Sequence, residues 1–127
     1  LDTMIGGNGD DTYVLDNSGD VFLEDPNGGI DTLRVVFNAY TIPINFENLL
    51  FSGSGSFVGT GNDADNAITG GGKADKLYGM DGNDVLTGLV GADLLDGRSR
   101  HLPRIVQVEI DEAVARRLQK IRIFHEE

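Results

Sequence analysis

Apolar and polar positions recur in this chain with a period of nine residues. Two runs contain eight pairs in which an aspartate or asparagine is followed two residues later by an apolar residue. The first run of such pairs is Asp2/Met4, Asp11/Tyr13 and Asp20/Phe22, and Asp31/Leu33 extends it after a two-residue insertion. The second run is Asn66/Ile68, Asp75/Leu77, Asp84/Leu86 and Asp93/Leu95. A fixed period is typical of repeat proteins, whose units are too small to bury their apolar residues alone and therefore stack on their neighbours.

Nine residues hold one short strand and one turn, whereas a helical repeat needs about thirty residues or more. The apolar residue is the middle of a strand of about three residues, and it points to one face while its neighbours point to the other. The turn before each strand is rich in glycine, as in Gly6–Asp11 and Gly79–Asp84. Glycine at the first and fourth places of the turn allows positive φ angles. The pattern predicts an all-β fold, a right-handed parallel β-roll (β-solenoid) with two sheets, an apolar interior and turns stacked along both edges.

Two repeats complete one coil, so an aspartate should meet the residue eighteen positions away rather than the next aspartate. The expected pairs are Asp2 with Asp20, Asp75 with Asp93, Asp84 with Asn66 and, across the insertion near Pro26 and Asn27, Asp11 with Asp31. Two adjacent carboxylates repel each other unless a cation lies between them. Carboxylate and carbonyl oxygens favour Ca²⁺ over Mg²⁺, and the repeats contain no histidine or cysteine for zinc. The turn edges are therefore candidate calcium sites.

Residues Gly6 to Val14 match the G-G-x-G-x-D-x-U-x nonapeptide of calcium-binding RTX proteins. Over about residues 1–97 the chain resembles an RTX (haemolysin-type) calcium-binding β-roll module of a type I-secreted bacterial protein, and Tyr13–Asp20 and Phe46–Leu50 are similar to repeat variants of that family. The resemblance implies Ca²⁺ as the cofactor, an extracellular location, a larger polypeptide around the module and the type I secretion apparatus as a partner. The expected ligands are Asp2, Gly6, Gly7, Gly9, Asp11, Asp20, Gly29, Asp31, Asn66, Gly70, Gly72, Asp75, Gly79, Asp81, Gly82, Asp84, Gly88, Gly91 and Asp93.

Some turns depart from the repeat, and their sites should differ accordingly. Lys73 takes the fourth place of the turn before Asp75, which should weaken the site there. Glycine is also missing from two second places, which are held by Met80 and Leu89. We expect the sites near Asp11/Asp31 and near Asp84 to be the best formed.

Residues 37–60 break the register between the first repeat run, residues 1–36, and the second, residues 61–97. Tyr40, Ile42, Ile44 and Phe46 alternate with polar residues and Pro43, which predicts strands longer than those of the repeats. These side chains could form a platform for a sugar. Core packing is the commoner role, because the aromatic residues share their alternating face with the isoleucines. We therefore expect bridging strands that continue the core.

Residues 98–127 contain no glycine and carry a net charge of +2. Alternating apolar positions at residues 105–110 predict a short strand, and Val114, Leu118 and Ile121 at helical spacing predict a helix after it. We expect this strand/helix tail to cap the last coil, whose edge otherwise exposes unpaired backbone groups. The alternatives are a basic amphipathic helix for a membrane or acidic partner, an uncleaved secretion signal, and a scar of fusion or truncation.

Residues 1–97 contain 16 acidic residues against Arg34, Lys73 and Lys76, a net charge of −13, and all 18 glycines of the chain. Such a segment repels itself and is costly to order, so it should stay unfolded until a cation binds. An acidic repeat region also disfavours nucleic acid as a partner. The sequence has no cysteine, no stretch long enough for a transmembrane helix, and no serine, histidine and aspartate set for catalysis within the repeats.

We therefore expect calcium binding coupled to folding, in a non-catalytic module of a larger secreted bacterial protein. The first alternative is part of a calcium-dependent β-solenoid enzyme, a lyase or epimerase of acidic polysaccharide, with Arg34, Lys73 or Lys76 contacting the sugar acid. Three cations in the repeats make a poor basic groove for that role. The second alternative is a surface or adhesive structural protein that self-associates with calcium. The start at Leu1, within a repeat, favours a module taken from a longer chain.

Overall fold

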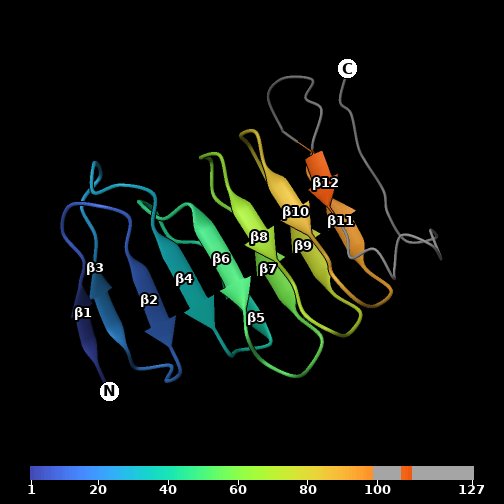
Figure 1. Ribbon diagram of the computed structural model, residues 1–127, viewed down its shortest axis with the longest axis horizontal. Coiled ribbons are helices and arrows are strands. Elements are labelled where there is room, and N and C mark those ends of the chain that lie inside the picture. Colours follow the sequence, from blue (N-terminus) through green and yellow to red (C-terminus); the bar gives the residue numbers. More distant parts are fainter. Residues whose placement is uncertain (99–106, 110–127) are drawn as a thin grey trace.

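Short strands joined by glycine-rich turns build the protein, as the repeat length predicts. The computed structural model describes residues 1–98 and 107–109, which form strands and no helix (Figure 1). The strands are β1 (Thr3–Ile5), β2 (Thr12–Leu15), β3 (Val21–Leu23), β4 (Thr32–Val35), β5 (Ala39–Thr41), β6 (Asn48–Phe51), β7 (Val58–Thr60), β8 (Ala67–Thr69), β9 (Lys76–Tyr78), β10 (Val85–Thr87), β11 (Leu94–Asp96) and β12 (Gln107–Glu109).

The even-numbered strands form one sheet in the order β12-β10-β8-β6-β4-β2. The odd-numbered strands form a second sheet in the order β11-β9-β7-β5, and β1 pairs with β3 alone. Every pairing among these strands is parallel. The prediction of an all-β parallel solenoid is therefore confirmed, although the odd-numbered strands form two separate sheets rather than one.

The pairing register gives the length of each coil. Thr3 pairs with Val21, a shift of 18 residues, and the same shift relates β7 to β9, β9 to β11 and β8 to β10. Thr12 pairs with Thr32, a shift of 20 residues. The predicted stacking by two repeats is confirmed, and the insertion is contained in the turn between β3 and β4.

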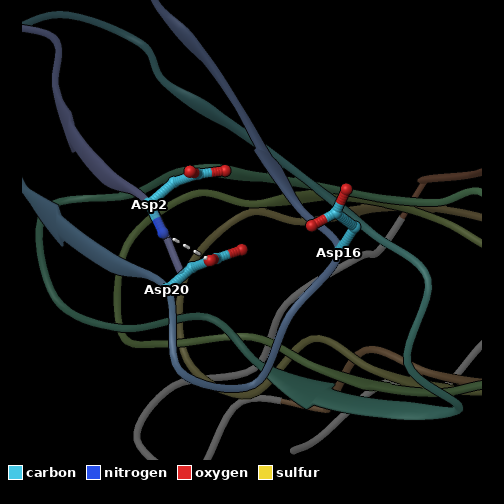
Figure 2. A group of neighbouring side chains, drawn as sticks. All are labelled: Asp2, Asp16 and Asp20. Atoms are coloured by element: carbon cyan, nitrogen blue, oxygen red, sulfur yellow. Dashed lines mark hydrogen bonds between the residues drawn. The ribbon is translucent and has the colours of Figure 1, made fainter.

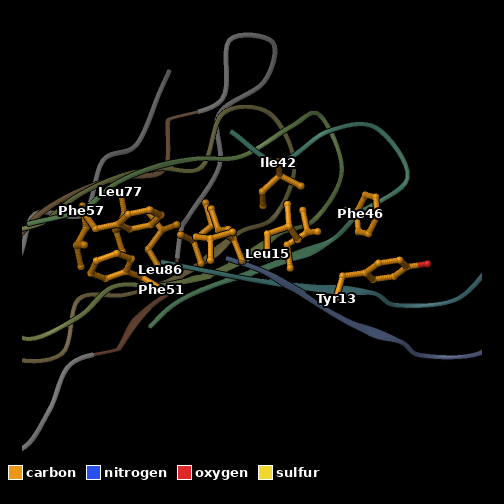
Figure 3. Close-up of a cluster of buried hydrophobic side chains, with 13 residues drawn as sticks. Tyr13, Leu15, Ile42, Phe46, Phe51, Phe57, Leu77 and Leu86 are labelled. Carbon is orange, nitrogen blue, oxygen red and sulfur yellow. The ribbon is translucent and has the colours of Figure 1, made fainter. Parts of the chain in front are cut away.

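Inward-pointing side chains of both sheets form one apolar core (Figure 3), because side chains alternate between the two faces of a strand. Phe51 stacks on Phe57 with ring centroids 4.5 Å apart. Both rings belong to the same core as the buried aliphatic side chains of the second repeat run. The buried apolar side chains are Tyr13, Leu15, Leu33, Val35, Ile42, Phe46, Leu49, Phe51, Phe57, Ile68, Leu77, Leu86 and Leu95. Each contributes roughly 1.5–3 kcal/mol through burial.

The alternating pattern of residues 40–46 does not form the longer strand that it predicts. β5 has three residues, and the chain then turns at Ile44 and Asn45, whose φ is 74°. Ile44 is 81% exposed, while Ile42 and Phe46 are 2% and 1% exposed. The strand prediction was wrong because Pro43 has no N–H for a ladder and the turn at Asn45 reverses the chain. The core-packing role of Ile42 and Phe46 is confirmed.

Residues 37–60 belong to the roll itself. β6 pairs with β4 on one side and with β8 on the other, so the even-numbered sheet runs without interruption from the first repeat run to the second. The odd-numbered sheet has its break between β3 and β5 instead.

The predicted strand in the C-terminal segment is confirmed over three residues. β12 extends the even-numbered sheet, with Gln107 paired to Val85 of β10. The predicted helix that would contain Val114, Leu118 and Ile121 lies outside the described residues. Within the described residues, no helix is long and apolar enough to cross a membrane.

Candidate calcium sites along the turn edges

An acidic side chain at each stacked turn accepts a hydrogen bond from the backbone of the previous coil. The amide N–H of Asp11 donates to Oδ1 of Asp31 over 2.9 Å, although 20 residues separate them in sequence. The same bond, also at 2.9 Å, joins the other predicted pairs, which are Asp2 with Asp20, Asn66 with Asp84, and Asp75 with Asp93. The structure therefore brings all four predicted pairs together. Their role as calcium ligands stays a prediction.

Asp11 and Asp31 each have one buried carboxylate oxygen without the hydrogen-bond partner that such an oxygen needs. Asp31 is 0% exposed, and Oδ2 of both aspartates is buried without a hydrogen-bond partner. Within residues 1–98, no lysine or arginine forms an ion pair with either one. Burial raises the pKa of Asp31 above its ordinary value against the opposing hydrogen bond from Asp11, and the negative charges of Glu24 and Asp11 add to the rise. An unpaired buried charge is costly, so this geometry fits a bound cation.

Glu24 lies beside this pair and was missed from the predicted ligands. One carboxylate oxygen from each of Asp11, Glu24 and Asp31 lies within 4.8 Å of the other two. Glu24 directly follows β3 and so takes the first place of its turn, where most turns have glycine. An acidic residue in that place was the signal that could have identified it. Burial, with the hydrogen bond to Glu24, raises the pKa of the neighbouring Tyr13 to about 12.

A second acidic cluster lies on the other edge, where Asp16 joins Asp2 and Asp20 (Figure 2). Asp16 was also missed. It directly follows β2 and takes the second place of its turn, four residues before Asp20. Both oxygens of Asp20 accept backbone hydrogen bonds, from Asp2 and from Asn17, and these bonds lower the pKa of Asp20. Asp2 and Asp16 are exposed. Asp20 therefore has hydrogen bonds to both of its oxygens, whereas Asp31 has one to Oδ1 alone.

Glycine holds the first place of most turns because a side chain there would collide with the aspartate that ends the turn. A Cβ built on Gly6, Gly70, Gly79 or Gly88 would lie 2.4–2.5 Å from Oδ2 of the aspartate five residues later. None of these four described glycines has a positive φ. The prediction that first-place glycine provides positive φ was wrong. Its role is to leave space beside the carboxylate.

Positive φ occurs instead at the second and fourth places. The fourth-place glycines Gly9, Gly82 and Gly91 have φ of 108°, 105° and 128°. A Cβ on Gly91 would also lie 2.2 Å from the carbonyl oxygen of Lys73, so these glycines let one turn pack directly on the turn one coil earlier. Lys73 itself is exposed at the fourth place of its turn.

The remaining predicted ligands are distributed along the same turns. Gly29 has a φ of 142° and packs against the carbonyl oxygen of Gly9, while Gly7 has a φ of 82°. Asp81 is buried at 6% exposure, and Gly72 has open space beside it.

Met80 and Leu89, at second places, have φ of 68° and 63°. A left-handed conformation costs a non-glycine residue about 1–2 kcal/mol. Glycine avoids this cost, but it loses more conformational entropy on folding, which offsets part of the gain. We expect Met80→Gly and Leu89→Gly each to stabilise the calcium-loaded protein by about 0.5–1 kcal/mol, as measured by urea unfolding. Val90→Gly is the matched control beside Leu89, and it should destabilise. Equal destabilisation by all three substitutions would contradict this account.

Comparison with known protein families agrees with this geometry. Residues 2–22 and 60–95 match the model of the RTX calcium-binding nonapeptide repeat, in four copies. This chain therefore carries RTX calcium-binding repeats. The residues between the two matched stretches hold the turn between β3 and β4 and strands β4 to β6, which continue the same roll.

Two curated relatives of this chain are glycanases of Rhizobium meliloti (strain 1021). A stretch of 69 residues is 51% identical to endo-1,3-1,4-beta-glycanase ExsH, and one of the same length is 46% identical to endo-1,3-1,4-beta-glycanase EglC. Each match spans 54% of this chain but only 14% of the relative. No solved structure matches the chain.

Proposed function

We propose that the RTX module binds calcium along its turn edges, folds as it binds, and is a non-catalytic part of a larger bacterial protein secreted by a type I apparatus. The observation that supports calcium most directly is the pair Asp11 and Asp31, each with a buried carboxylate oxygen that has no partner. Such oxygens are the hard ligands that Ca²⁺ takes in sites of six to eight oxygens. The proposed ligands are the aspartates, Asn66 and the turn glycines predicted from the repeat.

The charge of the repeats explains why folding would depend on the ion. Residues 1–97 carry a net charge of −13, and the coil stacking places carboxylates in rows along the edges. Calcium relieves this repulsion. If each site binds at about 10⁻⁴ M, millimolar calcium contributes about 1.4 kcal/mol per site, and several sites together reach the stability of a small domain. Low calcium inside the cell and high calcium outside would then keep the chain unfolded until export.

Calcium binding is tested by isothermal titration calorimetry and by counting the bound ions after equilibrium dialysis. We expect several Ca²⁺ per chain with dissociation constants near 10⁻⁴ M, and much weaker binding of Mg²⁺, which prefers a tighter octahedron and keeps its water. Fewer than one bound Ca²⁺ per chain at millimolar calcium would overturn the proposal.

The glycanase relatives favour a parent protein that acts on polysaccharide. In that arrangement the module carries no catalytic residues, and the catalytic part lies in the remainder of the polypeptide. The rival function, direct action on acidic polysaccharide, needs a basic groove, and Arg34, Lys73 and Lys76 are the only cations of residues 1–97. Tight calcium-dependent binding of uronate oligomers by this chain would favour the rival function. Calcium-dependent self-association would favour an adhesive structural role.

We also propose that residues 98–127 cap the last coil, a role supported by β12, which covers the edge of β10. Truncation after Gly97 removes this strand and exposes the edge of the even-numbered sheet. We expect the truncated protein to need about twofold to tenfold more calcium for folding and to associate end to end. Circular dichroism and sedimentation velocity measure the two effects. A monomer with an unchanged calcium midpoint would instead favour a secretion signal or a fusion scar.

A further inference from the structure

Glu24 differs from the other acidic residues of the turn edges in its position and its contacts. It stands where most turns have glycine, and its carboxylate lies next to the Asp11 and Asp31 pair rather than in solvent. Asp31 is fully buried, and the unpartnered Oδ2 atoms of Asp11 and Asp31 belong to the same group. Three carboxylates thus gather at a point where Oδ2 of Asp11 and Oδ2 of Asp31 have no hydrogen-bond donor.

Tyr13 and the turn backbone hold Glu24 in this position. The Tyr13 hydroxyl donates to Oε2 of Glu24 and accepts a hydrogen bond of 2.6 Å from the N–H of Gly6. The N–H of Asp25 donates to Oε1 of Glu24 over 3.0 Å. Both oxygens are therefore oriented before any ion arrives, and each keeps lone pairs for a metal.

Space for an ion is preserved by a further glycine. A Cβ built on Gly28 would lie 2.2 Å from Oε1 of Glu24 and 2.8 Å from the carbonyl oxygen of Gly7. The carboxylate of Glu24 and the carbonyl of Gly7 therefore face the same volume, which a side chain at residue 28 would fill. A carbonyl beside carboxylates is the mixed oxygen set that calcium takes.

We propose that Asp11, Glu24 and Asp31 form one calcium site with three carboxylate ligands, and that this site fills before the other sites of the roll. Calcium affinity rises with the number of charged ligands and with the rigidity of the site. The predicted pairs in the second repeat run bring together two acidic residues at most, and the cluster of Asp2, Asp16 and Asp20 is exposed and already hydrogen-bonded. The inference rests on the proposed function, since the ion is calcium.

Calorimetric titration of the full chain with Ca²⁺ tests the ligand set. Glu24→Gln keeps the size of the side chain and removes its charge, and we expect it to abolish the tightest binding phase and to weaken that ion by about tenfold or more. Asp25→Asn is the matched control, because it removes the same charge from an exposed side chain of the same turn. Its affinity should stay within about twofold of the unmodified chain.

Terbium luminescence tests the place of the site, because Tb³⁺ takes oxygen ligands as Ca²⁺ does and is sensitised by a nearby tyrosine. The chain has no tryptophan and three tyrosines, so emission reports tyrosine alone. We expect the first equivalent of Tb³⁺ to give most of the emission, and Tyr13→Phe, which retains all three carboxylates, to abolish most of it. If Glu24→Gln fails to fold with saturating calcium, Tyr13→Phe decides the question.

The possible failures are separable. A chain that binds no calcium at all would overturn the proposed function and this inference together. A chain that binds calcium, but whose tightest phase is unchanged by Glu24→Gln and whose first terbium emission is unchanged by Tyr13→Phe, would overturn this inference alone.

Discussion

Removal of calcium is expected to convert the chain from a β-rich roll into a coil. The turn edges place carboxylates such as Asp31 and Asp75 in buried positions, at 0% and 1% exposure, and the repeats carry a net charge of −13. With each site contributing about 1.4 kcal/mol at millimolar calcium, the loss of several sites removes the whole stability of a domain this small. Far-UV circular dichroism should therefore change from coil-like to β-rich between micromolar and millimolar Ca²⁺.

Magnesium at the same concentration is the control for charge screening, because it neutralises charge without fitting a large flexible oxygen site. The expected result is much less β structure with Mg²⁺ than with Ca²⁺. A chain that retains its full β signal in excess chelator would show that the apolar core alone is sufficient for folding.

The solenoid could be predicted from sequence because the nine-residue period determines both which side chains point inward and how long each coil is. A side chain two residues after each turn aspartate, such as Leu77 or Leu86, must point inward in a strand of three residues, and both are fully buried. The coil length followed from the same period, which is why the pairing of Asp11 with Asp31 across the insertion was predicted correctly. Local periodicity was sufficient wherever the repeat was regular.

The predictions failed where a residue has a role that the repeat does not encode. Tyr40 to Phe46 alternates as a strand would, but Pro43 and the positive φ of Asn45 impose a turn there. Glu24 and Asp16 each directly follow a strand in the sequence, but that position alone does not show which aspartates they join, which depends on how the coils stack. The reason for first-place glycine also needed coordinates, since it is the closeness of a carboxylate rather than a backbone angle.

Substitutions of Asp11 and Asp31 should cause coupled losses of stability when calcium is present. When calcium is absent, removal of the Asp31 carboxylate should instead stabilise the residual structure. If Asp11 and Asp31 share one ion, Asp11→Asn and Asp31→Asn should each lose at least about 1.4 kcal/mol of calcium-dependent stability, and the double variant little more. In chelator, Asp31→Asn should retain more residual structure than the unmodified chain, because it removes a buried carboxylate oxygen without a partner.

Asp20 is the control for this register, because it lies nine residues from Asp11 but hydrogen-bonds to Asp2 on the other edge. Losses from Asp11→Asn and Asp20→Asn should therefore add, whereas losses from Asp11→Asn and Asp31→Asn should not. Urea unfolding at fixed millimolar calcium gives the four free energies that each double-mutant cycle needs. Additive losses for Asp11 and Asp31, with coupling between Asp11 and Asp20, would mean that each ion is shared by neighbouring repeats rather than by neighbouring coils.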